Sequence, residues 1–280
     1  MNVVEPQLQV QEIEAFLAKG VNLPPQPKVL LEIDALTAKD QVSMRAVAAL
    51  VGKDAGLTAR IFKVVNSPFF GIRTEIDSLD RAITLVGLKP ALAIIKSAAL
   101  RDAIGGDPKA NDAFWERAND IAVLAALIAK KQRDILRIAT EHAHMAGLFH
   151  DCGVPILMQR LPGYCADLAR AWPDLAAEDA QFKTSHVVAG YMMAKNWKLP
   201  EPVCQAVRHH HDAAQAPGEE HALIAILLMA THLRDLYCGY GDTNWGSVEP
   251  TILAELGISD LDKSEFTDEV LHQFQNSFNN

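Results

Sequence analysis

The fold of this 280-residue chain is decided by the stretch Gly147-Leu148-Phe149-His150-Asp151-Cys152-Gly153, where an apolar helical run ends in a His-Asp doublet. Neighbouring side chains on a regular helix diverge by about 100°, so the two groups can share a metal ion only at a helix end or where the ion lies between their directions. The glycine after the doublet predicts such an end. Adjacent imidazole and carboxylate groups, joined by a distant His or Asp, can hold a hydrolytic metal ion.

Two further groups of histidines are candidates to complete the set. His186 lies on a predicted helical face that steps by four residues from Glu178 through Phe182 to Gly190, and the glycine would let another helix approach closely. The run His209-His210-His211-Asp212 lies at the end of another predicted helix. Each histidine taken alone is more often a hydrogen-bonded core residue than a ligand, so only their convergence would indicate a metal site.

Apolar residues recur at spacings of three and four along nearly the whole chain, which predicts an all-α fold. We expect a single multi-helix bundle, with two helical lobes as the alternative. The predicted parts are an N-terminal helical extension (1–22), a main domain (23–240) with lobes at about 23–105 and 110–240, and a C-terminal helix and tail (241–280). Helices are predicted from Phe114 to Lys131 and around Ala139–Phe149, Gln181–Lys195, Glu201–His210 and Ala222–Leu236.

Composition excludes several classes of protein. The net charge of −9 and the pI near 5.5 disfavour nucleic acid as a partner. The longest apolar run, Ala222–Ala230, is shorter than the roughly 18 residues that a membrane-spanning helix needs. The cysteines are widely spaced, which predicts reduced thiols rather than a disulfide framework; they are Cys152, Cys165, Cys204 and Cys238. We therefore expect a soluble, cytoplasmic protein that does not contact membranes.

Beyond the doublet, the chain resembles the HD superfamily and, more closely, its HDOD branch, the HD-related output domain of bacterial signalling proteins. The resemblance covers roughly residues 23–236 and implies an HD-like helical bundle with a role in signal transduction. Several separate motifs occur in the order that the family shows. These motifs are Leu23-Pro24-Pro25-Gln26-Pro27, Lys53–Arg60, Asn66–Gly71, Ala82-Ile83 with Leu85-Val86-Gly87, and Asn196-Trp197-Lys198-Leu199-Pro200.

Catalytic members of the wider superfamily are metal-dependent phosphohydrolases, and the resemblance implies a ligand set that begins with an upstream His and ends with a late Asp. In this chain those two positions match Arg117 and Thr231. A guanidinium has no lone pair to offer a cation, and a threonine hydroxyl is neutral where a carboxylate is expected. The candidates that remain for one metal ion are His150, Asp151, His186, His210 and His211.

The substitutions at Arg117 and Thr231 allow three interpretations. Asp120 or Asp235, each within one turn of a substituted position, could restore part of the lost charge. Alternatively, Arg117 replaces the metal ion as the positive partner of Asp151, whose burial as a lone carboxylate would be costly. A third possibility is that Arg117 and the nearby histidines bind a nucleotide or phosphate ligand.

The leading hypothesis is a non-catalytic signalling output module with a degenerate HD metal site and no cofactor. It would act through contacts with a signalling protein supplied in trans, whose identity the sequence does not reveal. The alternative is a metal-dependent phosphohydrolase that acts on a nucleotide-type substrate with one divalent transition metal bound at His150, Asp151, His186 and His210.

Overall fold

The computed structural model is helical, and the residues that it describes contain no β-strand, which confirms the predicted all-α class. The predicted N-terminal extension (1–22) lies outside the described residues, as do Cys165 and Asp212. The structure describes residues 23–38, 43–66, 74, 76–104, 108–161, 163–164, 175–211, 213, 216, 218–240 and 245–277. None of the described helices is both long and apolar enough to cross a membrane.

The chain divides into two compact units, and the smaller one consists of Pro25–Ala103 with Ser264–Asn280. In this unit α3 packs against α2 and α5, and α4 packs against α5. Asn66 exchanges two hydrogen bonds with the backbone of Ile76, at 2.7 and 2.9 Å, and so fixes the ends of the segment between α4 and α5. The helices are α2 (Lys28–Thr37), α3 (Met44–Val51), α4 (Ala55–Val65), α5 (Leu79–Val86), α6 (Leu88–Ile104) and α16 (Lys263–Asn276).

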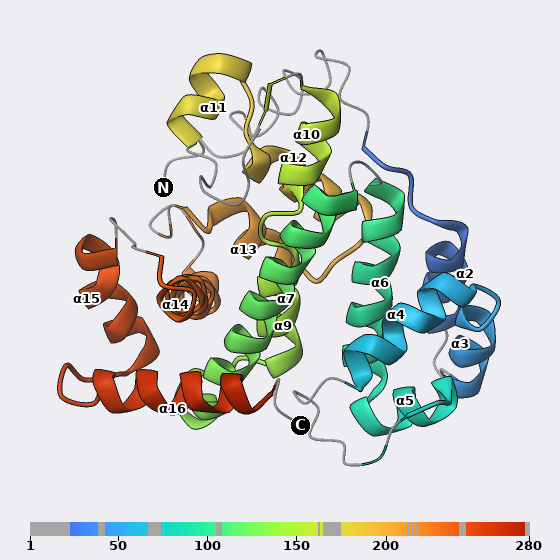
Figure 1. Cartoon of the computed structure of the whole chain (residues 1–280), viewed down its shortest axis with the longest axis horizontal. Coiled ribbons are helices and arrows are strands. Elements are labelled where there is room, and N and C mark those ends of the chain that lie inside the picture. The colour runs from blue at the N-terminus through green and yellow to red at the C-terminus, as the bar shows by residue number, and fades with distance from the viewer. Residues whose placement is uncertain are drawn as a thin grey trace. The chain divides into compact units, whose positions relative to one another are not determined.

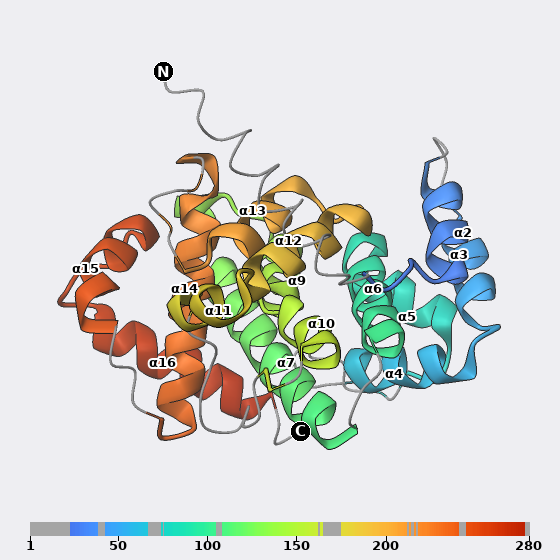
Figure 2. The same ribbon diagram turned by 90° about the horizontal axis from the view of Figure 1, so that it is seen from above.

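The larger unit, Met1–Pro24 with Ile104–Lys263, contains the His-Asp doublet. Its core is built on α7, which packs against both α9 and α14, and Figures 1 and 2 both show α9 alongside α7. The later helices α12 and α13 pack on each other, α10 packs on α12, and α13 packs on α9. The helices are α7 (Pro108–Lys131), α8 (Arg133–Leu136), α9 (Thr140–Phe149), α10 (Gly153–Arg160), α11 (Leu175–Phe182), α12 (His186–Asn196), α13 (Glu201–His209), η3 (Gly218–Glu220), α14 (His221–Tyr237) and α15 (Trp245–Leu256).

Two glycines allow the helices around the doublet to approach closely. A Cβ atom added to Gly153, at the start of α10, would lie 2.0 Å from the carbonyl oxygen of His186 and 2.7 Å from the nitrogen of Gly190. A Cβ atom on Gly190 would lie 3.0 Å from Val207 of α13. The predicted close approach at Gly190 is therefore confirmed, and it brings the first turn of α12 against the doublet.

The structure differs from two of the predicted helices. The face from Glu178 to Gly190 does not belong to one helix, because α11 ends at Phe182 and α12 begins at His186. Lys183, between the two helices, has a φ of 52°, a left-handed conformation that a continuing α-helix does not contain. The predicted C-terminal segment 241–280 contains two helices, α15 and α16, where the sequence predicted one.

Replacement of Gly153 by alanine tests the close approach. We expect Gly153→Ala to lower the free energy of unfolding by about 2–3 kcal/mol, because the new methyl group meets backbone atoms that cannot turn aside. The matched control is Gly246→Ala in α15, where an added Cβ meets nothing within 4 Å. Alanine should stabilise that exposed helical position by up to about 1 kcal/mol. Urea unfolding of both variants measures the difference, and equal stabilities would contradict the packing described here.

Candidate metal centre

The His-Asp doublet occupies the turn between α9 and α10. The turn is closed by backbone hydrogen bonds from Cys152 N–H to the carbonyl of Phe149 and from Val154 N–H to the carbonyl of Asp151. The predicted helix end at the doublet is thus confirmed. His150 is 3% exposed and Asp151 is 1% exposed, so both polar groups are buried and need polar partners.

Four predicted candidates converge on one point in the larger unit. Asp151, His186, His210 and His211 each offer one donor atom, and these four atoms lie within 4.8 Å of one another. Nε2 of His186 is 3.4 Å from Nε2 of His210 and 3.0 Å from Nε2 of His211. Oδ1 of Asp151 is 3.4 Å from Nε2 of His186 and 3.2 Å from Nε2 of His210. The doublet, the start of α12 and the end of α13 meet there.

The far sides of the rings are held by other groups. Nδ1 of His210 lies 2.9 Å from the carbonyl oxygen of Val207, one turn earlier in α13. Nδ1 of His186 lies 2.9 Å from both carboxylate oxygens of Glu178. These contacts direct each Nε2 towards the shared point, which is the usual arrangement of histidines that bind a metal ion.

The histidine of the doublet contacts the carboxylate beside it. Nε2 of His150 lies 2.9 Å from Oδ2 of Asp151, and its Nδ1 lies 2.8 Å from the carbonyl oxygen of Gly147. His150 therefore contacts the outer oxygen of the carboxylate, while the inner oxygen faces His186 and His210. The converging set contains His211 and does not contain His150, in contrast to the predicted metal set of His150, Asp151, His186 and His210.

The charge at the centre is dominated by Asp151. Burial alone would raise the pKa of its carboxyl group, but the imidazoles of His150, His210 and His186 hold that pKa well below its ordinary value. Burial also lowers the pKa of His210. For His186, the opposing effects of Glu178 and Asp151 outweigh burial and raise the pKa. The carboxylate is therefore ionised and surrounded by nitrogen donors.

The donor atoms fit a tetrahedral metal ion. Metal–ligand bonds of about 2.0–2.1 Å place neighbouring donors of a tetrahedron about 3.3–3.4 Å apart. Four of the six separations between the donors are 3.0, 3.2, 3.4 and 3.4 Å, and all six are within 4.8 Å. Three imidazoles and one carboxylate are ligands typical of zinc and neighbouring transition metals. Asp151, His186 and His210 are buried, whereas His211 is exposed to solvent.

The hypothesis that Arg117 pairs with Asp151 requires a correction. The Arg117 guanidinium, 7% exposed on α7, forms a two-pronged salt bridge with the carboxylate of Asp235 on α14. Asp235 lies one turn after Thr231, on a helix that packs directly against α7, so its carboxylate reaches the guanidinium. The Thr231 hydroxyl donates to the carbonyl of Leu227 in its own helix, at 3.0 Å.

The two aspartates proposed to restore the lost charge both pair with arginines. Asp120 lies 3.7 Å from the guanidinium of Arg234, and a second nitrogen of that guanidinium lies 3.5 Å from Asp235. Burial raises the pKa of Asp120 to about 6, although Arg234 acts in the opposite direction. Alternating charges of α7 and α14 thus form one network, which consists of Asp120, Arg234, Asp235 and Arg117.

Sequence reasoning missed two residues beside the centre. Glu178 was placed on the same helix as His186, and Tyr164 was not considered. In the structure the Tyr164 hydroxyl donates to Glu178, and Glu178 in turn accepts from His186. Glu178 is 4% exposed. A buried carboxylate needs partners, so burial of Glu178 would have indicated a role for it. The sequence does not reveal that Glu178 is buried.

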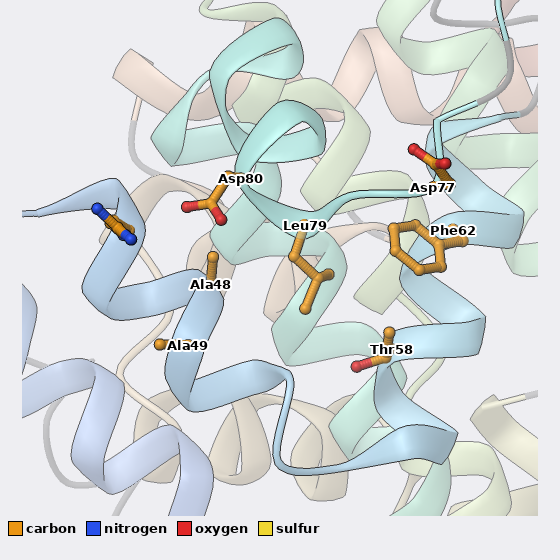
Figure 3. A pocket seen from close by; sticks show the side chains of 8 residues that line it. Ala48, Ala49, Thr58, Phe62, Asp77, Leu79 and Asp80 are labelled. Atoms are coloured by element: carbon orange, nitrogen blue, oxygen red, sulfur yellow. The ribbon is translucent and has the colours of Figure 1, made fainter.

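The smaller unit has a hollow of its own, of about 340 Å³. Figure 3 shows that its side chains come from α3, α4, the start of α5 and Asp77 just before it, with Asp77 and Asp80 on either side of Leu79. No histidine lines it, and none of the predicted site residues belongs to it. The lining residues are Arg45, Ala48, Ala49, Thr58, Phe62, Asp77, Leu79 and Asp80.

Comparison with known proteins supports the sequence resemblance. An uncharacterized protein of Treponema pallidum is 26% identical over 233 residues, which cover 81% of this chain and 45% of the relative, so the chain spans less than half of that protein. Two solved structures share the fold. A "putative phosphohydrolase" of Shewanella amazonensis has a TM-score of 0.70 at 21% identity, and the match covers 95% of this chain and 97% of the other.

The second solved structure is a "putative signal transduction protein" of Marinobacter aquaeolei, with a TM-score of 0.72 at 20% identity; the match covers 97% of this chain and 64% of the other. At such identities these likenesses establish the fold and not the activity. The model of the HDOD domain family matches residues 23–213, which is well over half of the chain. Together with the helical bundle and the buried doublet, this match establishes that the chain belongs to the HDOD family.

Proposed function

We propose that this chain is a signalling output module whose HD site keeps one metal position, with a structural role, and which acts through contacts with another protein. The observation that carries the proposal is the convergence of four protein donors at tetrahedral spacing. Catalytic zinc sites have three protein ligands and leave one position open for water or substrate. A fourth protein ligand closes the coordination sphere and favours a structural site.

The residues that would hold the metal ion are Asp151, His186, His210 and His211. When bound, the ion would supply a cross-link between the doublet, the start of α12 and the end of α13. Convergence of the donors favours this single metal over the expectation of no cofactor. It also explains why an ionised carboxylate and several imidazoles lie together in the core, since such a cluster otherwise carries a large desolvation cost.

The charge network between α7 and α14 supports the loss of two ligands from the set that the family resemblance implies. The resemblance places the missing ligands at Arg117 and Thr231, and at the first of these a permanent cation now neutralises Asp235. A divalent ion beside that guanidinium would be repelled. The same pairing argues against Arg117 as a nucleotide or phosphate site, because its two terminal nitrogens already contact a carboxylate.

The signalling role rests on the family and on the name of one structural neighbour, a signal transduction protein. The partner would be another signalling protein, which binds this chain in trans. In this proposal the bundle presents the docking surface, and the metal position maintains the packing of α10, α12 and α13 beneath it.

The second candidate is a metal-dependent phosphohydrolase, and one observation favours it. His211 is exposed, whereas the other three ligands are buried. It is therefore the ligand that water or a substrate phosphate could replace, which would leave three protein ligands and an open position. The name of the Shewanella neighbour points in the same direction. The two proposed functions differ in whether the metal-bound protein hydrolyses phosphate esters.

Metal analysis of protein purified without chelators distinguishes these functions. We expect one transition-metal ion per chain, and loss of that ion with a lower melting temperature in Asp151→Ala and His186→Ala. His142→Ala is the matched control, because His142 lies on α9 but outside the converging group. The wild-type protein should not hydrolyse bis(p-nitrophenyl) phosphate. Two ions per chain would contradict the degenerate site, and hydrolysis that disappears in Asp151→Ala would establish the enzyme.

A double-mutant cycle tests the role of the arginine that replaces a ligand. Arg117→Met should lower the free energy of unfolding by about 2–3 kcal/mol, since it leaves the Asp235 carboxylate largely buried with only the more distant Arg234 as partner. Arg117→Met combined with Asp235→Leu should recover much of that loss, because the unpaired charge is gone. Chemical denaturation measures all variants. Additive losses in the double variant would mean that the two side chains do not depend on each other.

A further inference from the structure

Glu178 is a buried carboxylate that the proposed metal site does not use as a ligand. It lies on α11, and only 4% of its surface is exposed. The carboxylate is nevertheless fully engaged. Oε1 accepts the hydroxyl of Tyr164, Oε2 accepts the backbone N–H of His186 at 2.9 Å, and both oxygens lie 2.9 Å from Nδ1 of His186.

These contacts fix both the backbone and the ring of His186. His186 is the first residue of α12, and the side chain of the preceding Ser185 makes no capping hydrogen bond. The Glu178 carboxylate accepts from the first N–H of the helix, where a negative charge is also favourable for the helix dipole. The same carboxylate holds Nδ1, so that Nε2 faces Asp151, His210 and His211.

We propose that Glu178 is a positioning residue that couples occupation of the metal site to helix α11. The inference rests on the proposed single-metal site and adds a residue and a consequence to it. A metal ion at Nε2 leaves Nδ1–H as the only donor of the ring, and that donor is directed at Glu178. Carboxylates placed in this way behind a histidine ligand orient the ring and increase its basicity.

The consequence for α11 follows from linkage. If the contact between Glu178 and His186 is stronger in the metal-bound protein, metal binding stabilises α11. By reciprocity, folding of α11 then raises the metal affinity by the factor by which metal binding favours the folded helix. The helix has eight residues, and its second contact with this region is the edge-to-face packing of Phe182 on Tyr164, whose ring centres are 5.5 Å apart. Glu178 and Tyr164 thus connect the metal site to a short peripheral helix.

Glu178→Gln tests the proposal in the full chain. Glutamine has the same size and keeps an oxygen that can accept the His186 N–H, but it lacks the charge and the second acceptor. Zinc affinity, measured by competition with a chromophoric chelator, should fall roughly 10- to 100-fold. Hydrogen exchange should show that zinc protects the amides of α11 in the wild-type protein and protects them much less in the variant. Tyr164→Phe should lower the affinity by a smaller factor.

The matched control is Glu201→Gln, which changes a carboxylate of the same unit that pairs with Lys195 and Gln205 rather than with a histidine. Its zinc affinity should equal that of the wild-type protein. Unchanged affinity in both Glu178→Gln and Tyr164→Phe would overturn the positioning role while the metal site stands. Equal protection of α11 by zinc in wild type and Glu178→Gln would overturn the coupling. A wild-type protein that binds no zinc would overturn the metal site and, with it, this inference.

If Glu178→Gln does not fold, Tyr164→Phe alone decides the matter, because it removes one hydrogen bond from the carboxylate and leaves the contacts of His186 in place. The visible absorption of the cobalt-substituted protein gives an independent measure. A displaced His186 ring alters the ligand geometry and therefore the spectrum, whereas a purely structural effect on α12 would lower stability and leave the spectrum of the folded protein unchanged.

Discussion

The close approach of α10 to α12 is the constraint on which the rest of the larger unit depends. Because Gly153 and Gly190 have no side chains, the backbone after the doublet lies directly against the first turn of α12. This contact places the Asp151 carboxylate 3.4 Å from the His186 imidazole. The end of α13 then completes the cluster, since Gly190 also packs against Val207, three residues before His210. The site residues can therefore come together only because the two glycines let the helix backbones pack closely.

Buried carboxylates need cations or hydrogen-bond donors, and the larger unit meets this need in two ways. Around Asp151 the partners are imidazoles, a type of group that can also bind a metal ion. Around Asp235 the partners are guanidinium groups, which neutralise charge but cannot bind a metal ion. Both carboxylates are therefore neutralised, but only the surroundings of Asp151 contain donors suited to metal coordination. This division underlies the proposal of a module with one structural metal.

In the proposed module, a closed set of four ligands and an outer carboxylate would suit a structural metal ion better than a hydrolytic one. Hydrolysis requires an open coordination position, whereas a structural ion requires that its ligands be held from outside. Glu178 supplies such support for His186, and Val207 supplies it for His210. Glu178 belongs to a different helix, α11, so the proposed coupling would connect the metal centre with that helix. The exposure of His211 favours the hydrolytic alternative, because water or a substrate could replace this ligand.

The sequence by itself determined the helical class, the family, the helix end at the doublet, and most of the converging histidines. These follow from local patterns, because helical periodicity and a glycine after the doublet act over a few residues. Only the tertiary structure decided that Asp235 is the partner of Arg117, that His211 rather than His150 joins the cluster, and that Lys183 separates Glu178 from the helix of His186. The first two depend on which side chains meet across helices far apart in the chain, and such contacts are set by packing of the whole unit, which local spacing does not encode. The break at Lys183 is local, but the helical spacing of the apolar residues on either side of it gave no sign of it.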